Sequence, residues 1–323
     1  MSDKEITVCE PEIGEWDSFV ANDESTANLF HSSMWMSLFD NPEAAGVTRI
    51  IAFRHNDQII GGVTYLLKSL KRALIPLLSS YSGIVYDKHF ATDVVTEFLN
   101  WAKESKFSEI ILCIPDSSLN IELLKNQGFT CEKRQTYIVD VSESVESLWA
   151  KLDNSKKRQI RKAERSNITI SFESPNEDEA FALFENTFLK HGENCPITQS
   201  LFRSVLNHTN AQFHCAYKDT QLMGFVISHL YKKVAYYTVA SASEEAKHLG
   251  IPSLLVWQTL CHYAKREDAD TFDFMGANIP SIAKFKEGFS PTLKNYYIIK
   301  KSDTCIKLSK TALALARRLR LWK

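Results

Sequence analysis

A weak internal repeat constrains the fold of this chain more than any other feature. The segments AFRHNDQIIGGV (residues 52–63) and AYKDTQLMGFV (residues 216–226) each hold a strand, a polar turn and a second strand that begins with Gln-apolar-apolar-Gly. Both patterns predict β-hairpins, at about residues 49–67 and 212–231, and the first turn is expected to be one residue longer.

The segments after the two hairpins are also alike. In the first half an amphipathic helix, TDVVTEFLNWAKES, precedes the apolar strand EIILCI, the short helix NIELLKNQGF and the strand TYIVDV. In the second half the helix PSLLVWQTLCHYAKRE begins at Pro252 and precedes the strand TFDFM. The repeat therefore predicts an α/β chain with mixed sheets, built as two domains of similar design.

The expected domain boundaries derive from the repeat and from two basic segments. We expect an N-terminal domain over residues 1–142, a basic linker helix over 143–166, a catalytic C-terminal domain over 167–302 and a basic amphipathic tail helix over 303–323. The linker contains KLDNSKKRQIRKAER, and the tail contains IKLSKTALALARRLRLWK.

Composition excludes several classes of protein. Hydrophobic residues make up 44% of the chain, enough for full cores, and a net charge of −1 gives no overall bias toward nucleic acid, so DNA is not an expected partner. The seven cysteines are scattered without the paired spacing of disulfide frameworks or zinc sites, which favours reduced thiols and no metal. The polar N-terminus is unlike a signal peptide, so a cytoplasmic location is expected.

Four stretches resemble one family. LFHSSMWMSLF, LWAKLDNSKKRQIRKAERSNI, LGIPSLLVWQTLCHYAK and FDFMGANIPSIAKFKEGF occur in the order found in FemAB-like and BioF2-like acyltransferases, which have two GNAT domains in tandem. The resemblance implies two GNAT-like domains and the transfer of an acyl group to an amine, with acyl-CoA such as acetyl-CoA as co-substrate.

Candidate catalytic residues lie in the last of these stretches. By resemblance, Lys286 matches the family lysine placed near the tetrahedral intermediate. Beside Phe285 part of its side chain would be shielded from water, and there its positive charge would interact more strongly than in water. Gly276 is expected to let the backbone come close to substrate. Asp273 stands at a strand end, where it either takes part in the site or caps the next turn, while Lys284 is expected on the surface.

A site for the phosphates of the acyl donor is expected at the start of the second long helix. Lys247, His248, Gly250 and Ser253 surround that helix N-terminus, where free N–H groups and the helix dipole attract anions. The usual glycine-rich loop of GNAT proteins is replaced by HLGIPS, which leaves aminoacyl-tRNA or an acyl carrier protein open as other donors.

Further residues are candidates for substrate contact. Arg158 and Arg161 of the basic linker either form a solvated face or bind phosphates of a nucleotide-sugar, a lipid diphosphate or tRNA. His191 and Tyr237 are expected near the acceptor. The tail places Leu308, Ala312, Leu315, Leu319 and Trp322 on one helical face, which either packs on the protein or lies peripherally on an anionic membrane surface.

The sequence thus predicts an N-acyltransferase that moves an acetyl or other acyl group from a thioester to an amine of a sugar or peptide in bacterial envelope polysaccharide or cell-wall synthesis. One alternative is an aminoacyl-tRNA-dependent Fem-type aminoacyltransferase, which is less favoured because the chain has no room for a long coiled-coil insertion. The other is a non-catalytic tandem-GNAT binding protein.

Overall fold

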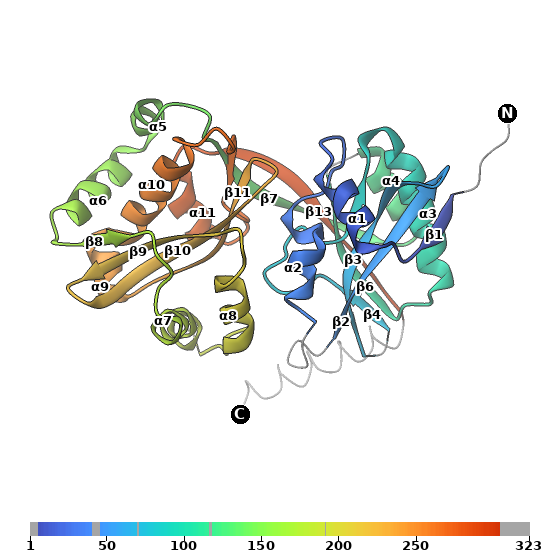
Figure 1. Ribbon diagram of the computed structural model, residues 1–323, viewed down its shortest axis with the longest axis horizontal. Coiled ribbons are helices and arrows are strands. Elements are labelled where there is room, and N and C mark those ends of the chain that lie inside the picture. The colour runs from blue at the N-terminus through green and yellow to red at the C-terminus, as the bar shows by residue number, and fades with distance from the viewer. Residues whose placement is uncertain (1–5, 41–45, 70, 116–117, 191, 304–323) are drawn as a thin grey trace, which may run out of the picture. The chain divides into compact units, whose positions relative to one another are not determined.

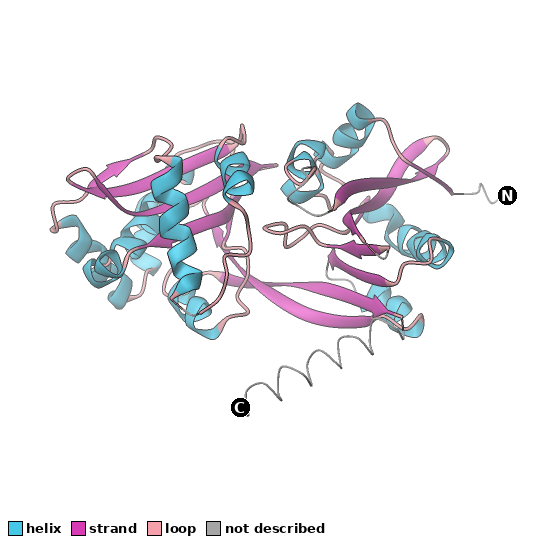
Figure 2. Ribbon diagram, turned by 90° about the horizontal axis from the view of Figure 1, so that it is seen from below, coloured by secondary structure: helices cyan, strands magenta, loops and turns pink. Residues whose placement is uncertain are grey.

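The computed structural model describes residues 6–40, 46–69, 71–115, 118–190 and 192–303 (Figure 1). The chain divides into two compact units: unit 1 comprises residues 1–133 and 296–323, and unit 2 comprises residues 134–295. Each unit is a mixed sheet with helices on both faces (Figure 2), so the predicted α/β class with mixed sheets is confirmed.

In unit 1 the strands lie in the order β1-β2-β3-β4-β6-β13, and β5 pairs with β3. The β4 and β6 strands are parallel, and β13 is antiparallel to β6. The elements of this unit are β1 (Thr7–Cys9), α1 (Ile13–Ala21), η1 (Leu29–His31), α2 (Ser33–Ser37), β2 (Val47–His55), β3 (Gln58–Lys68), β4 (Arg72–Leu74), β5 (Ile84–Tyr86), η3 (Lys88–Phe90), α3 (Ala91–Glu104), β6 (Glu109–Pro115), α4 (Ser118–Asn126) and the larger part of β13 (Thr292–Ser302).

In unit 2 the order is β8-β9-β10-β11-β12-β7, again with one parallel pair, β11 and β12, followed by an antiparallel strand, β7. Helices α5, α6 and α10 lie on one face of this sheet and α7 and α8 on the other (Figure 1). Its elements are the larger part of β7 (Thr130–Asp140), α5 (Val145–Lys151), α6 (Asn154–Glu164), β8 (Thr169–Ser171), α7 (Glu177–Leu189), α8 (Gln199–Leu206), β9 (Ala211–Lys218), β10 (Gln221–Tyr231), β11 (Val234–Ala242), α9 (Glu244–Leu249), α10 (Ile251–Tyr263), β12 (Thr271–Asp273) and α11 (Pro280–Glu287).

The two units therefore repeat one strand order, and the predicted hairpins are present as β2–β3 and β9–β10. Both hairpins contain a register shift, at Phe53/Arg54 in the first and Leu222/Gly224 in the second. The expectation of a longer first turn is wrong, because two residues separate the strands in each hairpin. The one additional residue of the first segment lies within its strands and not in its turn.

The expected domain boundaries differ from the observed units because the last strand of each half pairs in the other unit. Strand β7 comes after α4 along the chain, yet its residues Ile138–Asp140 pair with β12 of unit 2. Strand β13 comes after α11, yet Tyr296–Ser302 pair with β6 of unit 1. Residues 143–166 belong to unit 2, so they are part of its fold and not a linker outside it.

The basic segment forms two helices, α5 and α6, instead of the single linker helix expected over residues 143–166. The break falls at Leu152, whose extended backbone turns the chain and buries its side chain in the core of unit 2. The N–H of Asp153 then donates to the carbonyl of Gly288 at 3.0 Å, so the break is tied to the end of α11.

Two adjacent glycines allow helices to approach both faces of β3 in unit 1. A Cβ atom on Gly61 would lie 2.6 Å from Cγ2 of Val94 in α3. A Cβ atom on Gly62 would lie 2.7 Å from the Trp16 ring in α1 and 2.2 Å from the Ile51 carbonyl oxygen. Because neighbouring strand residues face opposite sides of a sheet, the pair fixes α3 on one face and α1 on the other.

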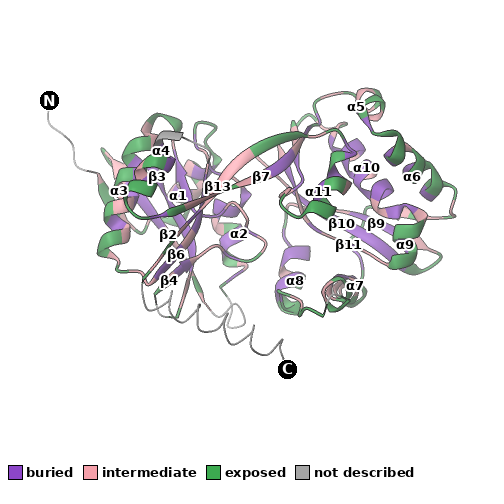
Figure 3. Cartoon of the chain, turned by 180° about the vertical axis from the view of Figure 1, so that it is seen from behind, coloured by how far each residue is buried: buried purple, intermediate pink, exposed green. Residues whose placement is uncertain are grey.

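The central helix of unit 2, α10, is buried on nearly every side (Figure 3). Its contacts reach α6 on one side and β10 and β9 on another. The buried positions of α6 are Lys156, Ile160 and Ala163, which repeat at helical spacing and face inward. The N-terminus of α10 is therefore held in place by α6, which decides the geometry of the neighbouring site.

Buried histidines in unit 2 predict a loss of stability in acid. His214 and His229 are both fully buried, and burial lowers the pKa of each to about 3. Neither ring nitrogen of His214 has a hydrogen-bond partner among the described residues. Below about pH 6.5 the histidines of the unfolded chain take up protons, whereas those of the folded unit do not. The free energy of unfolding therefore decreases as the pH is lowered, by about 1–2 kcal/mol per histidine at pH 5.

Urea unfolding at pH 7.5 and pH 5 measures this effect. We expect His214→Leu to make the dependence on pH shallower by about one proton, whereas the exposed control His89→Gln leaves it unchanged. An equally steep dependence in His214→Leu would show that this histidine does not titrate on unfolding.

Candidate active site

The candidate site lies where the two parallel strands of unit 2 separate. Residues 234–236 of β11 pair with residues 271–273 of β12, after which β12 ends while β11 continues to Ala242. No described strand pairs with the β12 side of β11 beyond Tyr236. The carboxyl ends of parallel strands are a common place for ligands in α/β sheets, and here the freed edge of β11 is available to one.

Lys286 brings a buried ammonium group to this point. Its side chain, on the last turn of α11, is only 6% exposed, and Nζ donates to the carbonyl oxygens of Phe274 at 2.7 Å and Gly276 at 2.8 Å. Burial lowers the pKa of Lys286 to about 8, and Asp273 partly opposes this shift. An ammonium has three protons, so one remains for an oxygen of a substrate.

Asp273 holds the turn that supplies those carbonyls. It is 5% exposed, and its carboxylate accepts from the hydroxyl of Thr136 at 2.6 Å and from the N–H of Met275 at 2.7 Å. The Thr136 hydroxyl accepts in turn from the N–H of Gly276 at 2.9 Å. Asp273 therefore caps the turn, which is one of the two roles that the sequence left open, and its oxygens are directed into the protein.

The role of Thr136 could not be identified from the sequence. It lies on β7, 137 residues from Asp273 along the chain, and reaches unit 2 only through the pairing of β7 with β12. A single threonine in a strand carries no local pattern that marks such a role, so knowledge of the strand pairing is needed to find it.

Two aromatic residues complete the wall around Lys286. Tyr237, the first β11 residue after the strands separate, is partly exposed, and its ring centre lies 5.8 Å from Lys286 Nζ. Burial of its hydroxyl raises the pKa of Tyr237, so the phenol stays protonated. The ring centre of Phe274 lies 5.9 Å from Lys286 Nζ, and the predicted Gly276 accepts from this ammonium through its carbonyl. The ring of Phe285, which was expected beside Lys286, lies against Lys156.

Lys156 is a second buried lysine, and it is absent from the site residues predicted from the sequence. Its side chain is 5% exposed, and Nζ lies 3.7 Å from the centre of the Phe285 ring, 3.4 Å from Gln159 Oε1 and 3.5 Å from the hydroxyl of Ser253. Burial lowers its pKa to about 8. The sequence did contain a signal for it: Lys156 lies at helical spacing from the apolar residues Ile160 and Ala163, so it faces the core, whereas the arginines of the helix face solvent.

The predicted phosphate site has a different arrangement in the structure. Ser253 is 1% exposed and donates to Gln159 Oε1 at 2.7 Å, while Gly250 lies against the Gln159 backbone. Lys247 and His248 remain exposed on α9, and Lys247 pairs with Glu244. An anion could reach Ser253 only after displacing α6, because the helix covers the first turn of α10.

The remaining candidates lie on the outside of unit 2 or beyond the described residues. Arg158 and Arg161 are exposed on α6, and the Arg161 guanidinium lies 5.6 Å from the centre of the Trp149 ring. His191 is outside the described residues. Within the described residues, no group of three or more His, Cys, Asp or Glu side chains is placed to hold a metal ion.

Gly250 provides a direct test of how tightly α6 and α10 pack. Its φ is +85°, and an added Cβ would lie 2.4 Å from the Gln159 carbonyl oxygen, so Gly250→Ala combines backbone strain with a backbone clash. We expect a loss of about 2 kcal/mol or more, measured by urea unfolding. Gly14→Ala is the matched control, because nothing lies within 4 Å of its added Cβ. Equal stability of the two variants would contradict the packing described here.

One family model matches the part of the chain that contains this site. Residues 150–287 match the family model described as an acetyltransferase (GNAT) domain, and this stretch includes Lys156, Tyr237, Asp273 and Lys286. In this stretch the chain is similar to GNAT acetyltransferase domains, in agreement with the predicted acyltransferase.

Solved structures extend the likeness to nearly the whole chain. FemX has a TM-score of 0.69 at 12% identity, with 90% of this chain and 96% of FemX covered. L-PGS from Bacillus licheniformis has a TM-score of 0.59 at 14% identity, covering 93% and 95%. A tandem GNAT protein from the clavulanic acid biosynthesis pathway has a TM-score of 0.58 at 10% identity, covering 93% and 100%. Among curated proteins, no sequence matches this chain.

These likenesses concern the fold, because all three identities are low. Together with the family model they confirm the GNAT-type fold in the tandem arrangement that the sequence predicted. No helix among the described residues is both long and apolar enough to cross a membrane.

Proposed function

We propose that this protein is an N-acyltransferase that moves an acetyl or other acyl group from a thioester donor, such as acyl-CoA, to an amine of a sugar or peptide. The observation that carries the proposal is the ammonium of Lys286, buried at the point where β11 and β12 separate. There a positive charge, a free strand edge and a protonated tyrosine come together.

The chemistry requires stabilisation of one developing charge. The amine nitrogen attacks the thioester carbonyl, a C–N bond forms and the C–S bond breaks. The proton that the amine loses ends on the departing thiolate, which leaves as a thiol. As the carbonyl oxygen of the thioester becomes negative, the third N–H of the Lys286 ammonium donates a hydrogen bond to it. This hydrogen bond is stronger in a buried site than it would be in water. Asp273 and Thr136 act as positioning residues, because they hold the turn whose carbonyls orient Lys286.

An aminoacyl-tRNA donor is the second candidate, and the outer face of α6 favours it. Arg158 and Arg161 are exposed there without an ion pair to a described residue, and Lys162, also exposed, donates from Nζ to the carbonyl of His248 at 2.7 Å. Arginines without acidic partners on one helix face suit a phosphate backbone. The packing of α6 over Ser253 also removes the helix N-terminus that a coenzyme A phosphate was expected to use.

A role in bacterial envelope polysaccharide or cell-wall synthesis is our proposal for the setting of this reaction. It is supported by the FemAB-like sequence stretches and by the shared fold of FemX.

Mass spectrometry of the products separates the donors. The purified protein is incubated with acetyl-CoA or with a mixture of aminoacyl-tRNAs, each with amino-sugar and peptide acceptors. An acceptor mass increased by an acetyl group supports the thioester donor, and one increased by an amino acid residue supports the tRNA donor. Intact acceptors with both donors across a broad acceptor panel would oppose the proposal.

Lys286→Ala tests the charge at the centre of the site. We expect the rate constant kcat to fall by a factor of roughly 100 or more, as for loss of an oxyanion donor. Lys284→Ala is the matched control, since Lys284 is exposed two residues away on the same helix and should leave kcat unchanged. Circular dichroism melting of both variants verifies folding, and an unchanged rate in a folded Lys286→Ala would remove this lysine from the chemistry.

The pH profile tests which form of Lys286 acts. If the ammonium stabilises an oxyanion, activity is present below the pKa of about 8 and is lost as pH rises through it. Lys156 also has a pKa of about 8, so the profile is repeated in Lys156→Met. We expect the loss of activity at alkaline pH to persist in that variant. Activity that instead appears as pH rises through the pKa of Lys286 would make this lysine a base.

A further inference from the structure

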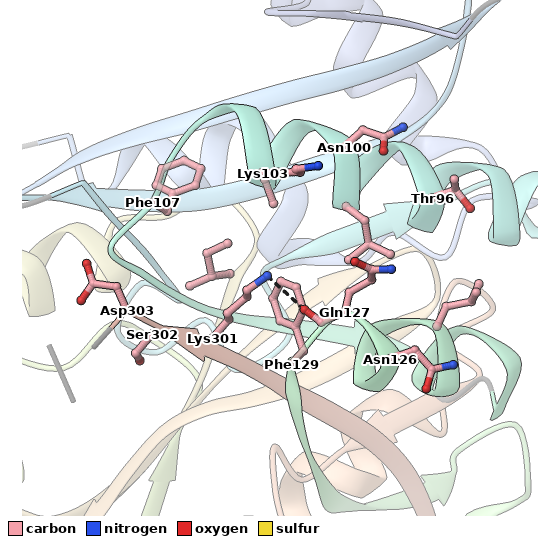
Figure 4. A pocket seen from close by; sticks show the side chains of 14 residues that line it. Thr96, Asn100, Lys103, Phe107, Asn126, Gln127, Phe129, Lys301, Ser302 and Asp303 are labelled. Carbon is pink, nitrogen blue, oxygen red and sulfur yellow. Dashed lines mark hydrogen bonds between the residues drawn. The ribbon is translucent and has the colours of Figure 1, made fainter. Parts of the chain in front are cut away.

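Unit 1 contains a groove between α3 and α4 that the acyl-transfer chemistry does not use. Its volume is about 620 Å³. Thr96, Asn100 and Lys103 line one side along α3, and Asn126 and Gln127 lie at the end of α4 on the other (Figure 4). The apolar part of the lining is formed by Leu99, Ala102, Phe107, Ile110, Leu123 and Phe129.

The chain itself runs along this groove just before the described residues end. Lys301, Ser302 and Asp303 line it, and Lys301 Nζ donates to the carbonyl of Gln127 at 3.0 Å while lying 5.1 Å from the centre of the Phe129 ring. The segment that begins at residue 304 is therefore connected to the edge of the groove.

In unit 2 the corresponding groove is covered by the segment after the corresponding strand. Strand β7 leads into α5, whose Leu148 is buried in the core together with Leu152 just after the helix. The Trp149 ring lies 5.1 Å from the ring of Trp257 on α10. The Ser290 hydroxyl donates to the carbonyl of Lys151 at 2.5 Å, so α5 is also tied to the end of α11.

The correspondence between the two units holds residue by residue. In unit 1, Ser302 pairs with Glu109 and the N–H of Asp303 donates to Ser108 O at 2.9 Å. In unit 2, Asp140 pairs with Thr271 and the N–H of Val141 donates to Asp270 O at 2.9 Å. Residues 304 onward in unit 1 thus start where residues 142 onward, which lead into α5, start in unit 2.

We propose that residues 304–323 pack into the groove of unit 1 and cover it, as α5 covers the equivalent face of unit 2. The segment has enough residues to form a helix along the groove. In such a helix Leu308, Leu315, Leu319 and Trp322 would share one face, which would suit the apolar lining of the groove. Burial of large apolar side chains supplies the attraction. This docking is independent of the acyl-transfer proposal, since the groove contains none of the residues of that site.

Hydrogen–deuterium exchange of the full chain tests the docking. We expect Leu315→Gln with Leu319→Gln, and also truncation after Asp303, to speed exchange of amides in residues 96–103 and 123–127 by about tenfold or more. The matched control, Lys310→Gln with Arg317→Gln, changes the opposite helical face and should preserve protection. Adding Leu123→Gln in the groove to the Leu315/Leu319 variant should cause no further loss of amide protection, since both changes remove the same contact.

Three outcomes would overturn the proposal. Equal exchange of the groove amides in the parent and the truncated chain would show that the tail does not cover them. Flotation of the parent with vesicles of anionic lipid, weakened in Lys310→Gln with Arg317→Gln and without groove protection in solution, would assign the tail to a membrane surface. Protection that disappears on dilution, together with a dimer in sedimentation, would make the occupant the tail of a second copy.

Discussion

The pairing of β7 with β12 is the interaction on which the catalytic unit depends. Strand β12 has only three residues, and β7 supplies the antiparallel partner for all of them. The same strand carries Thr136, which holds Asp273 and the N–H of Gly276. Those two contacts shape the turn whose carbonyls receive Lys286. Without β7 the sheet would lose an edge and the site would lose the geometry of its ammonium.

The exchange of last strands also explains why the repeat is visible and the domain boundaries are not. Hairpins, helices and apolar strands have local periodicity, so α3, β6, α10 and both hairpins could be predicted within a few residues. Strand pairing is not local: β7 and β13 look like the natural ends of their own halves, and only the complete sheets assign them to the other unit. Boundaries drawn along the chain therefore miss the exchange.

For the site, the sequence supplied residue types and the structure supplied their partners. The FKEGF stretch identified Lys286 by resemblance, but the aromatic rings near its ammonium are those of Tyr237 and Phe274, not the expected Phe285. Lys156 was hidden because a run of basic residues suggested one solvated face, whereas the helix turns one lysine inward. Ser253 shows the opposite error: a helix N-terminus suggested an anion site, but packing by α6 fills it with Gln159.

The two buried lysines indicate where unit 2 gives up stability. An ammonium transferred out of water is costly, and the lowered pKa values of Lys156 and Lys286 express that cost. Neither lysine forms an ion pair with a described carboxylate; carbonyl oxygens hold one, and an aromatic face and two weak polar contacts hold the other. A fold selected for stability alone would place apolar side chains at both positions.

Both buried lysines are connected to one helix, α11. Lys286 extends from its last turn, and Lys156 of α6 packs on Phe285 of that turn and on Gly288 just beyond it. Because the Lys156 stem fills the space beside Gly288, α6 fixes the end of α11 and so the direction from which Lys286 enters the site. The stability given up at Lys156 therefore supports the position of the charge that the proposed chemistry requires.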